Sequence, residues 1–335
     1  MGPAPTPVAP ITVTVVGAGL AGLVAARHLA EAGHGVVVLE HEGRAGGRLA
    51  TVEVAGARAD AGAQFFTVRS PDLAHRLGAW RRDGLVYEWC RGFGHPPDGH
   101  PRYAARGGFG ALARHLAQGL DVRLGVAAVS VRATPTGWEV VSDGGRLGSG
   151  PVLLACPVPT SLALLRAGGV PLEAAVGAEL GAIGYTPTLA VVAVADRPTA
   201  VPPPGGVQLR HGPFSFVADN AQKGISARPA LTLHATPEVS AARWGQPDRT
   251  VLADLTAAAR PWLGPARVVE ARLVRWSHAT PHPTYPQPAC VVATAPEVLV
   301  LAGDAFAGPR VEGAFLSGLA AAHAVSSSSR PGGRR

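Results

Sequence analysis

The amino-terminal segment places a glycine-rich turn between a predicted strand and a predicted helix. Residues 12–16 (TVTVV) are a β-branched apolar run, typical of a buried parallel strand. The motif G-x-G-x-x-G follows at Gly17, Gly19 and Gly22, and residues 20–32 are helix-forming. Such glycines allow a tight turn, the close approach of a pyrophosphate, and packing of the helix on the sheet. This order of elements predicts dinucleotide binding.

An acidic residue ends the next predicted strand. That strand covers residues 36–39, and Gly33 is expected to cap the helix before it. Glu40 lies 18 residues after Gly22 (40 − 22), close to the spacing of about 20 expected for the carboxylate that binds a ribose 2′-hydroxyl. A free carboxylate at this position also disfavours the 2′-phosphate of NADP.

A second turn, RAGGR, follows Glu40. Arg44 and Arg48 flank the pair Gly46–Gly47, and two guanidiniums can neutralise a pyrophosphate from the side opposite a helix N-terminus. The two turns together resemble those of the amine-oxidase-like flavoproteins, which hold FAD with both. The resemblance implies that Arg48 reaches the phosphates.

Composition is consistent with a large soluble enzyme of a bacterial cytoplasm. The 335 residues suffice for one or two domains, and no apolar run reaches the roughly 18 residues that span a bilayer. Residues 1–10 lack the pattern of a signal peptide, and the three cysteines have no C-x-x-C spacing, as expected in a reducing compartment. Residues 1–10 and 326–335 are expected to be disordered.

The formal charge of +7 does not by itself indicate a nucleic-acid-binding protein. The arginines are scattered, and no basic stripe with interleaved aromatic residues is visible. A positive field also suits an anionic small substrate, so we expect neither a nucleic acid nor a membrane as partner.

Further motifs extend the resemblance over most of the chain. D-A-G-A-Q-F-F at residues 60–66, R-Y at 102–103, G-G-F-G-A-L at 107–112 and G-W-E-V at 137–140 are similar to renalase and its bacterial relatives, a branch of the same family. The similarity resumes at residues 233–238, 274–276 and 299–321. It implies an α/β fold in which a G-x-G-x-x-G (Rossmann-like) FAD-binding domain is interleaved with an α+β mixed-sheet substrate domain, the p-hydroxybenzoate-hydroxylase-like architecture. The expected FAD-binding domain comprises residues 1–73, 102–160 and 278–335, and the substrate domain residues 74–101 and 161–277.

Local patterns predict further elements. Ser70-Pro71 should start a helix with Leu73, Leu77 and Trp80 on one face. Residues 121–131 and 137–142 are predicted to form a hairpin, with Gly145 in a turn. Other strand-like runs cover residues 51–59, 85–90, 152–155, 188–195, 214–220, 230–233, 267–275 and 298–301.

The C-terminal residues 299–321, called the closing segment below, place Gly303 and Asp304 after a strand and before a helix. In the family the acid at this place binds the ribityl chain of FAD. The helix starting near Glu312 would direct its N-terminus at the pyrimidine edge of the flavin, where a helix dipole stabilises the negative charge of the reduced form. Gly313 has no side chain, which permits a close approach. The cofactor contacts implied by the resemblance are Gly17, Gly19, Leu20, Ala21, Gly22, Glu40, His41, Arg44, Gly46, Gly47, Arg48, Gln64, Phe65, Phe66, Ala128, Gly303, Asp304, Glu312, Gly313 and Ala314.

Substrate contacts are expected from the middle of the chain. The resemblance places His234 and Trp276 over the flavin, and Arg310 suits an anionic group. Asn220 and Lys223 are the only asparagine and the only lysine of the chain, so their proximity suggests a specific role for the pair. We list His234, Trp276, Asn220 and Arg310 as candidate catalytic residues. His278 and His282 are spaced by four, but Pro281 and Pro283 preclude a helix that would align them as metal ligands, so no metal is expected.

The resemblance implies an FAD-dependent oxidase with non-covalently bound FAD, since no cysteine lies in the closing segment. Its implied substrate is a dihydro isomer of NAD(P), oxidised by hydride transfer, with oxygen as the electron acceptor and hydrogen peroxide as product. A flavin-containing amine oxidase is the alternative within the class; it needs an aromatic pair, for which Trp276, Tyr285 and Phe306 are the candidates. A non-catalytic binding protein on the same scaffold is the alternative of another class.

Overall fold

The computed structural model describes residues 11–94 and 98–328, which form two compact units built from interleaved segments. The first unit contains residues 11–47, 116–184 and 282–328, and the second contains residues 48–94, 98–115 and 185–281. The leader at residues 1–10 and the tail from residue 329 lie outside the described residues. Ser326–Ser328, expected in the tail, are the last turn of a helix.

The units are bounded differently from the expected domains. Residues 48–73, 102–115 and 278–281 belong to the second unit and residues 161–184 to the first. Packing explains the first difference, because the hairpin over residues 51–60 shares an apolar core with strands of the second unit. Helix α4 (Val158–Ala167) packs on strand β8 (Ala128–Thr134) of the first unit, which explains the second.

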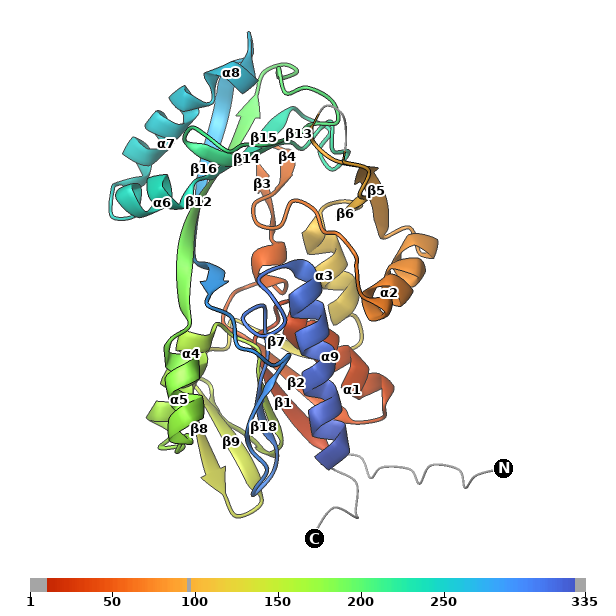
Figure 1. Ribbon diagram of the computed structural model, residues 1–335, viewed down its shortest axis with the longest axis vertical. Coiled ribbons are helices and arrows are strands. Elements are labelled where there is room, and N and C mark those ends of the chain that lie inside the picture. Colours follow the sequence, from red (N-terminus) through yellow and green to blue (C-terminus); the bar gives the residue numbers. More distant parts are fainter. Residues whose placement is uncertain (1–10, 95–97, 329–335) are drawn as a thin grey trace. The chain divides into compact units, whose positions relative to one another are not determined.

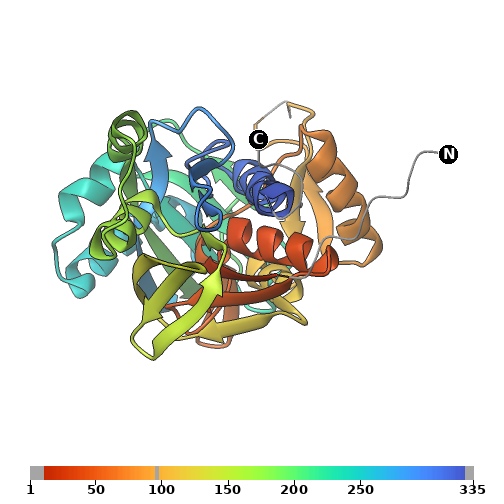
Figure 2. The same cartoon turned by 90° about the horizontal axis from the view of Figure 1, so that it is seen from below.

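The first unit is organised around a six-stranded sheet with the order β17-β18-β11-β1-β2-β7. All its neighbouring strands are parallel except the pair β17–β18, and Val15 pairs with Val38 on one side and Leu153 on the other. Helices α1 and α9 pack on this sheet, and the three-stranded sheet β10-β9-β8 also packs against β1 and β11 (Figure 2). Strands covered on both faces are continuous apolar runs. The elements of this unit are β1 (Thr12–Val16), α1 (Leu20–Glu31), β2 (Gly35–Glu40), β7 (Asp121–Leu124), β8, β9 (Gly137–Ser142), β10 (Gly145–Gly150), β11 (Val152–Leu154), α4, α5 (Ala174–Gly181), β17 (Cys290–Ala293), β18 (Leu299–Leu301) and α9 (Val311–Ser328).

Helices α1 and α9 pack against each other and cross obliquely (Figures 1 and 2). A Cβ on Gly318 would lie 2.4 Å from the carbonyl oxygen of Ala21, and the rings of His28 and His323 are 4.8 Å apart. Since residue numbers increase in the same direction along both helices at these contacts, their N-termini point the same way. Gly318 therefore permits the close approach of the two backbones.

The second unit contains a five-stranded sheet with the order β13-β14-β15-β12-β16. One face of the sheet is covered by helices α6–α8, and the other packs against the hairpin β3–β4. The elements are β3 (Thr51–Val54), β4 (Ala57–Asp60), α2 (Pro71–Arg82), β5 (Val86–Cys90), β6 (Arg102–Ala105), β13 (Gly206–Gln208), β14 (Phe214–Asp219), β15 (Ala230–Ala235), α6 (Pro237–Arg243), α7 (Asp248–Ala258) and α8 (Arg260–Leu263). Four further elements contain residues assigned to both units: η1 (Gly47–Leu49), α3 (Phe109–Ala117), β12 (Gly184–Ala195) and β16 (Val268–His282).

Strand alternation decides which side chains face the hairpin. In β12, Val191 and Ala193 point into the core under the helices, whereas Val192 and Val194 pack against the hairpin. The same period of two in β15 sends Leu231 and Leu233 to the helices. Thr232 and His234 consequently lie on the hairpin side.

Most predicted elements are confirmed, including β1, α1, β2, the start of α9, and α2 with Leu73, Leu77 and Trp80 buried. The prediction for residues 121–131 is wrong. Asp121–Leu124 is the edge strand β7 of the parallel sheet, and only β8 pairs with β9. Gly145 begins β10 rather than lying in the turn, and residues 51–59 form two strands because the chain turns at Ala55–Gly56, both with positive φ.

Candidate active site

Four parallel strands of the first unit end at one edge of the sheet, and the predicted nucleotide-binding residues follow them. Gly17 comes after β1, Glu40 ends β2, Ala155 comes after β11, and Gly303 and Asp304 come after β18. Ligands of open α/β sheets bind at this carboxyl edge. The sheet therefore gathers residues that are up to 287 positions apart (304 − 17).

The first glycine turn has the shape that a pyrophosphate needs. A Cβ on Gly22 would lie 2.0 Å from the carbonyl oxygen of Gly17, so a larger residue does not fit there. A Cβ on Gly19 would meet nothing within 4 Å, which leaves open space at the N-terminus of α1. Gly46 bridges to Gly19 and donates its N–H to the carbonyl of Ala18 at 2.7 Å. The two glycine turns are thus joined, and they fit a phosphate approaching the helix N-terminus.

Glu40 is buried, and its carboxylate ties the two turns together. Oε2 accepts the N–H of Ala18 at 2.8 Å, and Oε1 accepts the N–H of Glu42 at 3.0 Å. The exposed His41 places Nδ1 3.0 Å from Oε1. A carboxylate has about four lone-pair sites, so Oε2 retains the capacity to accept a ribose hydroxyl.

The closing helix α9 extends past the start of α1 at the same edge. Gly318 lies beside Ala21, so seven residues of α9 precede this contact, whereas α1 begins only one residue before it. At 1.5 Å per residue the N-terminus of α9 lies roughly 10 Å beyond the contact along its own axis. A Cβ on Gly313 would lie 2.1 Å from the carbonyl oxygen of Gly308, and Gly303 donates its N–H to Ser317 Oγ at 2.8 Å. The offset suits FAD, with its pyrophosphate at α1 and its flavin at α9.

In the second unit, the carbonyl oxygen of Ala61 brings together two predicted substrate contacts. It lies 3.1 Å from Nε2 of His234 and accepts the indole N–H of Trp276 at 3.0 Å. A carbonyl only accepts, so Nε2 of His234 carries the proton. Burial, together with the charge of Lys223, lowers the pKa of His234 from 6.5 to about 4. The ring is consequently neutral at physiological pH, with Nδ1 as its unprotonated nitrogen.

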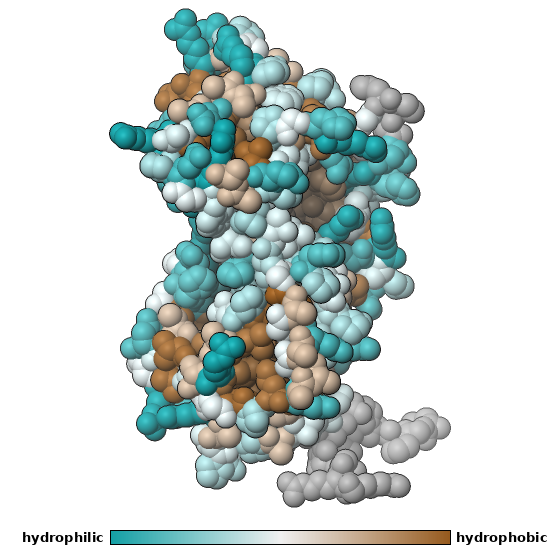
Figure 3. Space-filling model, turned by 60° about the vertical axis from the view of Figure 1, so that its left-hand side comes forward, coloured by the Kyte–Doolittle hydropathy of each residue, from teal (hydrophilic) through white to brown (hydrophobic). Residues whose placement is uncertain are grey.

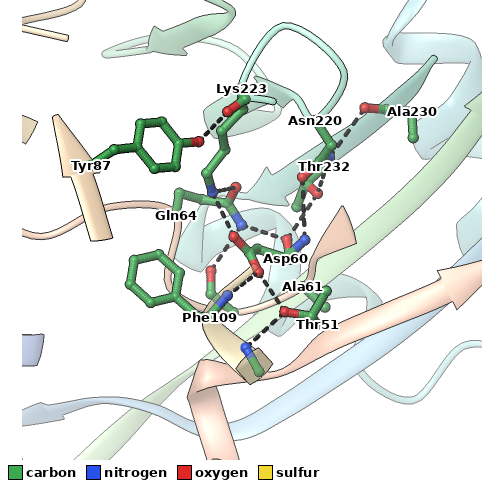
Figure 4. A network of polar contacts seen from close by, with 12 residues as sticks. Thr51, Asp60, Ala61, Gln64, Tyr87, Phe109, Asn220, Lys223, Ala230 and Thr232 are labelled. Carbon is green, nitrogen blue, oxygen red and sulfur yellow. Dashed lines mark hydrogen bonds and ion pairs between the residues drawn. The ribbon is translucent and has the colours of Figure 1, made fainter. Parts of the chain in front are cut away.

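A network of polar side chains holds the segment before Ala61 (Figure 4). Lys223 Nζ lies 2.8 Å from Asp60 Oδ2, and the hydroxyl of Thr51 and the N–H of Phe109 both donate to Oδ1, at 2.7 and 2.8 Å. Tyr87 donates its hydroxyl to the carbonyl of Lys223. Burial raises the pKa of Tyr87 to about 12, so it remains a neutral phenol.

Aromatic rings gather next to His234. Phe216, its cross-strand neighbour, has its ring centroid 5.7 Å from that of Phe65 and 5.1 Å from that of Phe93. The guanidinium of Arg102 lies 5.9 Å from the centroids of both Phe65 and Phe93. The half-buried Phe65 thus belongs to an apolar wall capped by a cation.

Some residues predicted to contact the substrate or the cofactor instead bond to, or pack against, other residues of the protein. Asn220 is completely buried. Its Oδ1 accepts the N–H of Asp60, and its Nδ2 donates to the carbonyl of Ala230 and to Oγ1 of Thr232. Gln64 donates its amide to the carbonyls of Asp60 and Gly62, and Phe66 is a core residue packed among aromatic rings. Internal hydrogen bonding therefore accounts for Asn220 without a substrate contact.

Other predicted residues are placed as follows. Arg48 donates Nη1 to the carbonyl of Ala279 at 3.0 Å, and its charge, after burial, lowers the pKa of His278. Arg44 and Arg310 are exposed, and the carbonyl of Arg310 accepts the N–H of Ala314 at the start of α9. Ala128 is the first residue of β8.

Sequence reasoning missed Asp60 and the carbonyl of Ala61, which organise the residues around His234. Asp60 stood in a recognised motif, but its partner Lys223 is 163 positions away. The single lysine and single asparagine of the chain were the available signal, and both proved to be buried within this network.

The described part of the chain lacks both a cluster of metal-binding side chains and a helix able to cross a membrane. It contains no group of three His, Cys, Asp or Glu side chains arranged for a metal ion, and His278 and His282 lie on strand β16. None of its helices combines the length and hydropathy needed to cross a bilayer. On the face drawn in Figure 3, apolar residues gather in a patch in the lower half, with hydrophilic residues around it.

Comparisons with solved structures agree with this fold. A redesigned triple mutant of putrescine oxidase superimposes with a TM-score of 0.73 at 17% identity, covering 95% of this chain and 100% of that one. An oxidoreductase from Methanosarcina mazei gives a TM-score of 0.65 at 15% identity, with 92% and 99% coverage. At these identities the likeness concerns the fold alone, and it confirms the expected Rossmann-like domain interleaved with a substrate domain.

Curated relatives match only a short stretch. A phytoene dehydrogenase from Streptomyces griseus is 52% identical over 61 residues, which are 18% of this chain and 12% of that protein. An L-amino-acid oxidase from Mus musculus is 60% identical over 42 residues, 12% of this chain and 7% of that protein. The stretches that match cover only a small part of these relatives' lengths.

Two family models cover nearly all of the described chain. The model of the NAD(P)-binding Rossmann-like domain matches residues 15–80, which include both glycine turns and Glu40. The model of the flavin containing amine oxidoreductases matches residues 79–326, most of the chain and all of the closing segment. The protein belongs to the family of flavin-containing amine oxidoreductases.

Proposed function

We propose that this protein is a renalase-like, FAD-dependent oxidase that oxidises a dihydro isomer of NAD(P) to NAD(P)+. One observation carries the choice of substrate: the polar groups beside Trp276 offer no strong base at neutral pH. His234, with a pKa lowered to about 4, is neutral and donates its proton to a carbonyl, and the ammonium of Lys223 is held by Asp60.

The chemistry of a dihydronicotinamide matches such a site. Its ring becomes an aromatic pyridinium when it loses a hydride, so no proton has to be removed. Bound FAD would supply the hydride acceptor and, through its reoxidation by oxygen, the route to hydrogen peroxide. The overall reaction balances as dihydro-NAD(P) + O2 + H+ → NAD(P)+ + H2O2.

The residues of the second unit would bind and orient this ring. Trp276 and Phe65 offer flat apolar surfaces that exclude water, and Nδ1 of His234 can accept a carboxamide N–H. The net positive charge of the chain favours a phosphate-bearing substrate. In the first unit, the joined glycine turns, Glu40 and the N-terminus of α9 would hold non-covalent FAD.

Anaerobic rapid mixing tests the proposal directly. The flavin absorbance of the purified protein should bleach within seconds on mixing with an isomer of NAD(P)H reduced at a ring carbon other than C4. Ordinary NADH serves as the matched control, since it differs only in the position of the added hydride. Bleaching by NADH alone, or by neither compound, refutes the assignment.

An amine oxidase is the second candidate, and the family match favours it. Tyr285 and Phe306 in the first unit offer two aromatic rings, but their centroids are 5.5 Å apart, so an amine would contact the pair and not lie between the rings. An amine must be unprotonated to lose a hydride, so this reaction should accelerate with rising pH. Peroxide release from a panel of polyamines and arylamines, with no response to dihydronicotinamides, would replace our proposal by this one.

A non-catalytic binding protein on the same scaffold is the remaining alternative. The intact glycine turns and Glu40 argue for a bound dinucleotide, because the space over Gly19 has no other occupant within the unit. A colourless protein that does not take up added FAD would support the binding role and exclude both oxidases.

A further inference from the structure

The only lysine of the chain is buried. Lys223 has no exposed side-chain surface, and neither has its partner Asp60, 2.8 Å away. The two belong to different parts of the second unit: Asp60 ends the hairpin β3–β4, and Lys223 lies in the turn after β14 (Figure 4). Replacing such a pair with apolar residues is often neutral or stabilising, so stability alone is a weak reason to keep it.

The pair is surrounded by groups that complete it. The hydroxyl of Thr51 and the N–H of Phe109 satisfy the second oxygen of Asp60. The ammonium of Lys223 lies 5.2 Å from the ring centroid of Trp89 and 5.5 Å from that of Phe109. These contacts orient Asp60 in a single way, because its oxygens have separate sets of donors.

The backbone of Asp60 is held as tightly as its side chain. Its N–H donates to Oδ1 of Asn220 at 3.2 Å, and its carbonyl accepts from Gln64 Nε2 at 2.6 Å and from Thr232 Oγ1 at 2.9 Å. The next carbonyl along the chain is that of Ala61, which receives His234 and Trp276. The direction of that carbonyl therefore depends on how Asp60 is held.

We propose that the buried Lys223–Asp60 pair is a positioning device: it aims the carbonyl of Ala61 so that His234 and Trp276 are fixed in one orientation, with His234 neutral and protonated on Nε2. The two residues act through Ala61 and do not touch the substrate. The inference rests on the proposed function only in taking His234 and Trp276 as substrate contacts.

Among the charged groups near His234, it is Lys223 whose charge changes the pKa of the ring. Its cross-strand partners are Phe216 on β14 and Ala190 on β12, and neither titrates. The hairpin side contributes the Ala61 carbonyl, and beyond it the Asp60 carboxylate paired with Lys223. The positive charge of Lys223 and burial both lower the pKa of His234.

The tautomer of His234 can be measured in the unmodified protein. Nitrogen-15 histidine spectra of the FAD-loaded full chain at pH 6, assigned with His234→Gln, should show a neutral ring with the proton on Nε2. A cationic ring at pH 6, or a proton on Nδ1, overturns the proposal. This measurement needs neither a substrate nor a variant of the ion pair.

The charge-neutral variant Lys223→Met/Asp60→Asn tests the positioning itself. It leaves no unpaired buried charge, and it should fold. We expect the indole N–H of Trp276 to exchange with solvent about tenfold faster or more than in the unmodified protein, because its acceptor is no longer held. The titration of His234 should shift, because the charge of Lys223 lowers its pKa, the hydrogen bond to Ala61 raises it, and the variant alters both.

Two controls separate positioning from general loosening. The indole N–H of Trp138 donates to the carbonyl of Glu297 in the first unit and should exchange at its original rate. The variant Arg243→Met/Asp254→Asn removes a more exposed ion pair of the second unit and should leave Trp276 unchanged. Unchanged Trp276 exchange and His234 titration in Lys223→Met/Asp60→Asn refute the inference, as does equal acceleration at Trp138.

These readouts distinguish two failures. If the His234 tautomer and the Trp276 exchange rates are as expected but dihydronicotinamides do not bleach the flavin, the substrate assignment fails and the positioning role stands. If bleaching occurs and Trp276 exchange does not respond to the ion pair, the positioning role fails alone.

Discussion

The titration of His234 should make the protein lose stability in mild acid. Its pKa of about 4 in the folded protein lies below the ordinary 6.5 that it regains on unfolding. Between these values the unfolded chain binds more protons than the folded one. Stability contributed by the neutral ring is therefore fully present above pH 6.5 and is lost as the pH falls towards 4.

The magnitude follows from the two pKa values. Each unit of difference corresponds to about 1.36 kcal/mol, so the difference of about 2.5 units limits the loss to roughly 3 kcal/mol. Because the transition is gradual, about 2 kcal/mol of this should be lost between pH 7 and pH 5. His234→Gln removes the titrating group and should remove this pH dependence.

Urea unfolding at several pH values between 5 and 7.5 provides the assay. The free energy of unfolding of the unmodified protein, minus that of His234→Gln, should fall by about 2 kcal/mol from pH 7 to pH 5. His211→Gln, in an exposed bend of the same unit, is the control for the loss of a histidine as such. A pH-independent difference for His234→Gln would refute the reasoning that burial holds the ring neutral.

Three further predictions concern the first glycine turn and the Lys223–Asp60 pair. Gly22→Ala should yield colourless protein destabilised by about 3 kcal/mol, because its Cβ would lie 2.0 Å from the Gly17 carbonyl oxygen. Flavin absorbance and the thermal midpoint check this, and a yellow, stable variant contradicts it. Gly19→Ala should keep the thermal midpoint of the FAD-free protein yet lose FAD on dialysis, since its Cβ meets nothing in the protein and would take the space proposed for a phosphate. Retention equal to the unmodified protein argues against this phosphate site. Lys223→Met alone should cost about 3–5 kcal/mol, and adding Asp60→Asn should restore much of it, as measured by urea unfolding; equal stability of the single and double variants would show that Asp60 is not left uncompensated.

Local patterns were sufficient for the nucleotide-binding half of the first unit. The apolar run of β1, the glycines, α1 and Glu40 follow one another within 30 residues, so covalent spacing alone brings them to the turn. The start of α9 at Val311 was likewise readable, since Gly303 and Asp304 interrupt the chain between a strand and a helix. Such signals concern the nearest neighbours of each residue.

Where a strand had two available partners, local patterns were insufficient. Asp121–Leu124 and Ala128–Thr134 have similar strand character, but the first pairs with β2 and the second with β9. Pairing depends on distant residues and on burial, which a window of sequence does not contain. The turn at Ala55–Gly56 was missed because Ala55, with φ 45°, is not a usual turn residue there.

The substrate side was decided by tertiary structure. The amino-acid order identified His234 and Trp276 by resemblance, but their common acceptor is a backbone carbonyl, which carries no sequence signature. Lys223 and Asp60 form their contact across 163 positions, after the hairpin β3–β4 has packed on the sheet of the second unit. The spacing of a turn is set by covalent geometry, whereas a buried charge gains its partner only when long-range packing removes both groups from water.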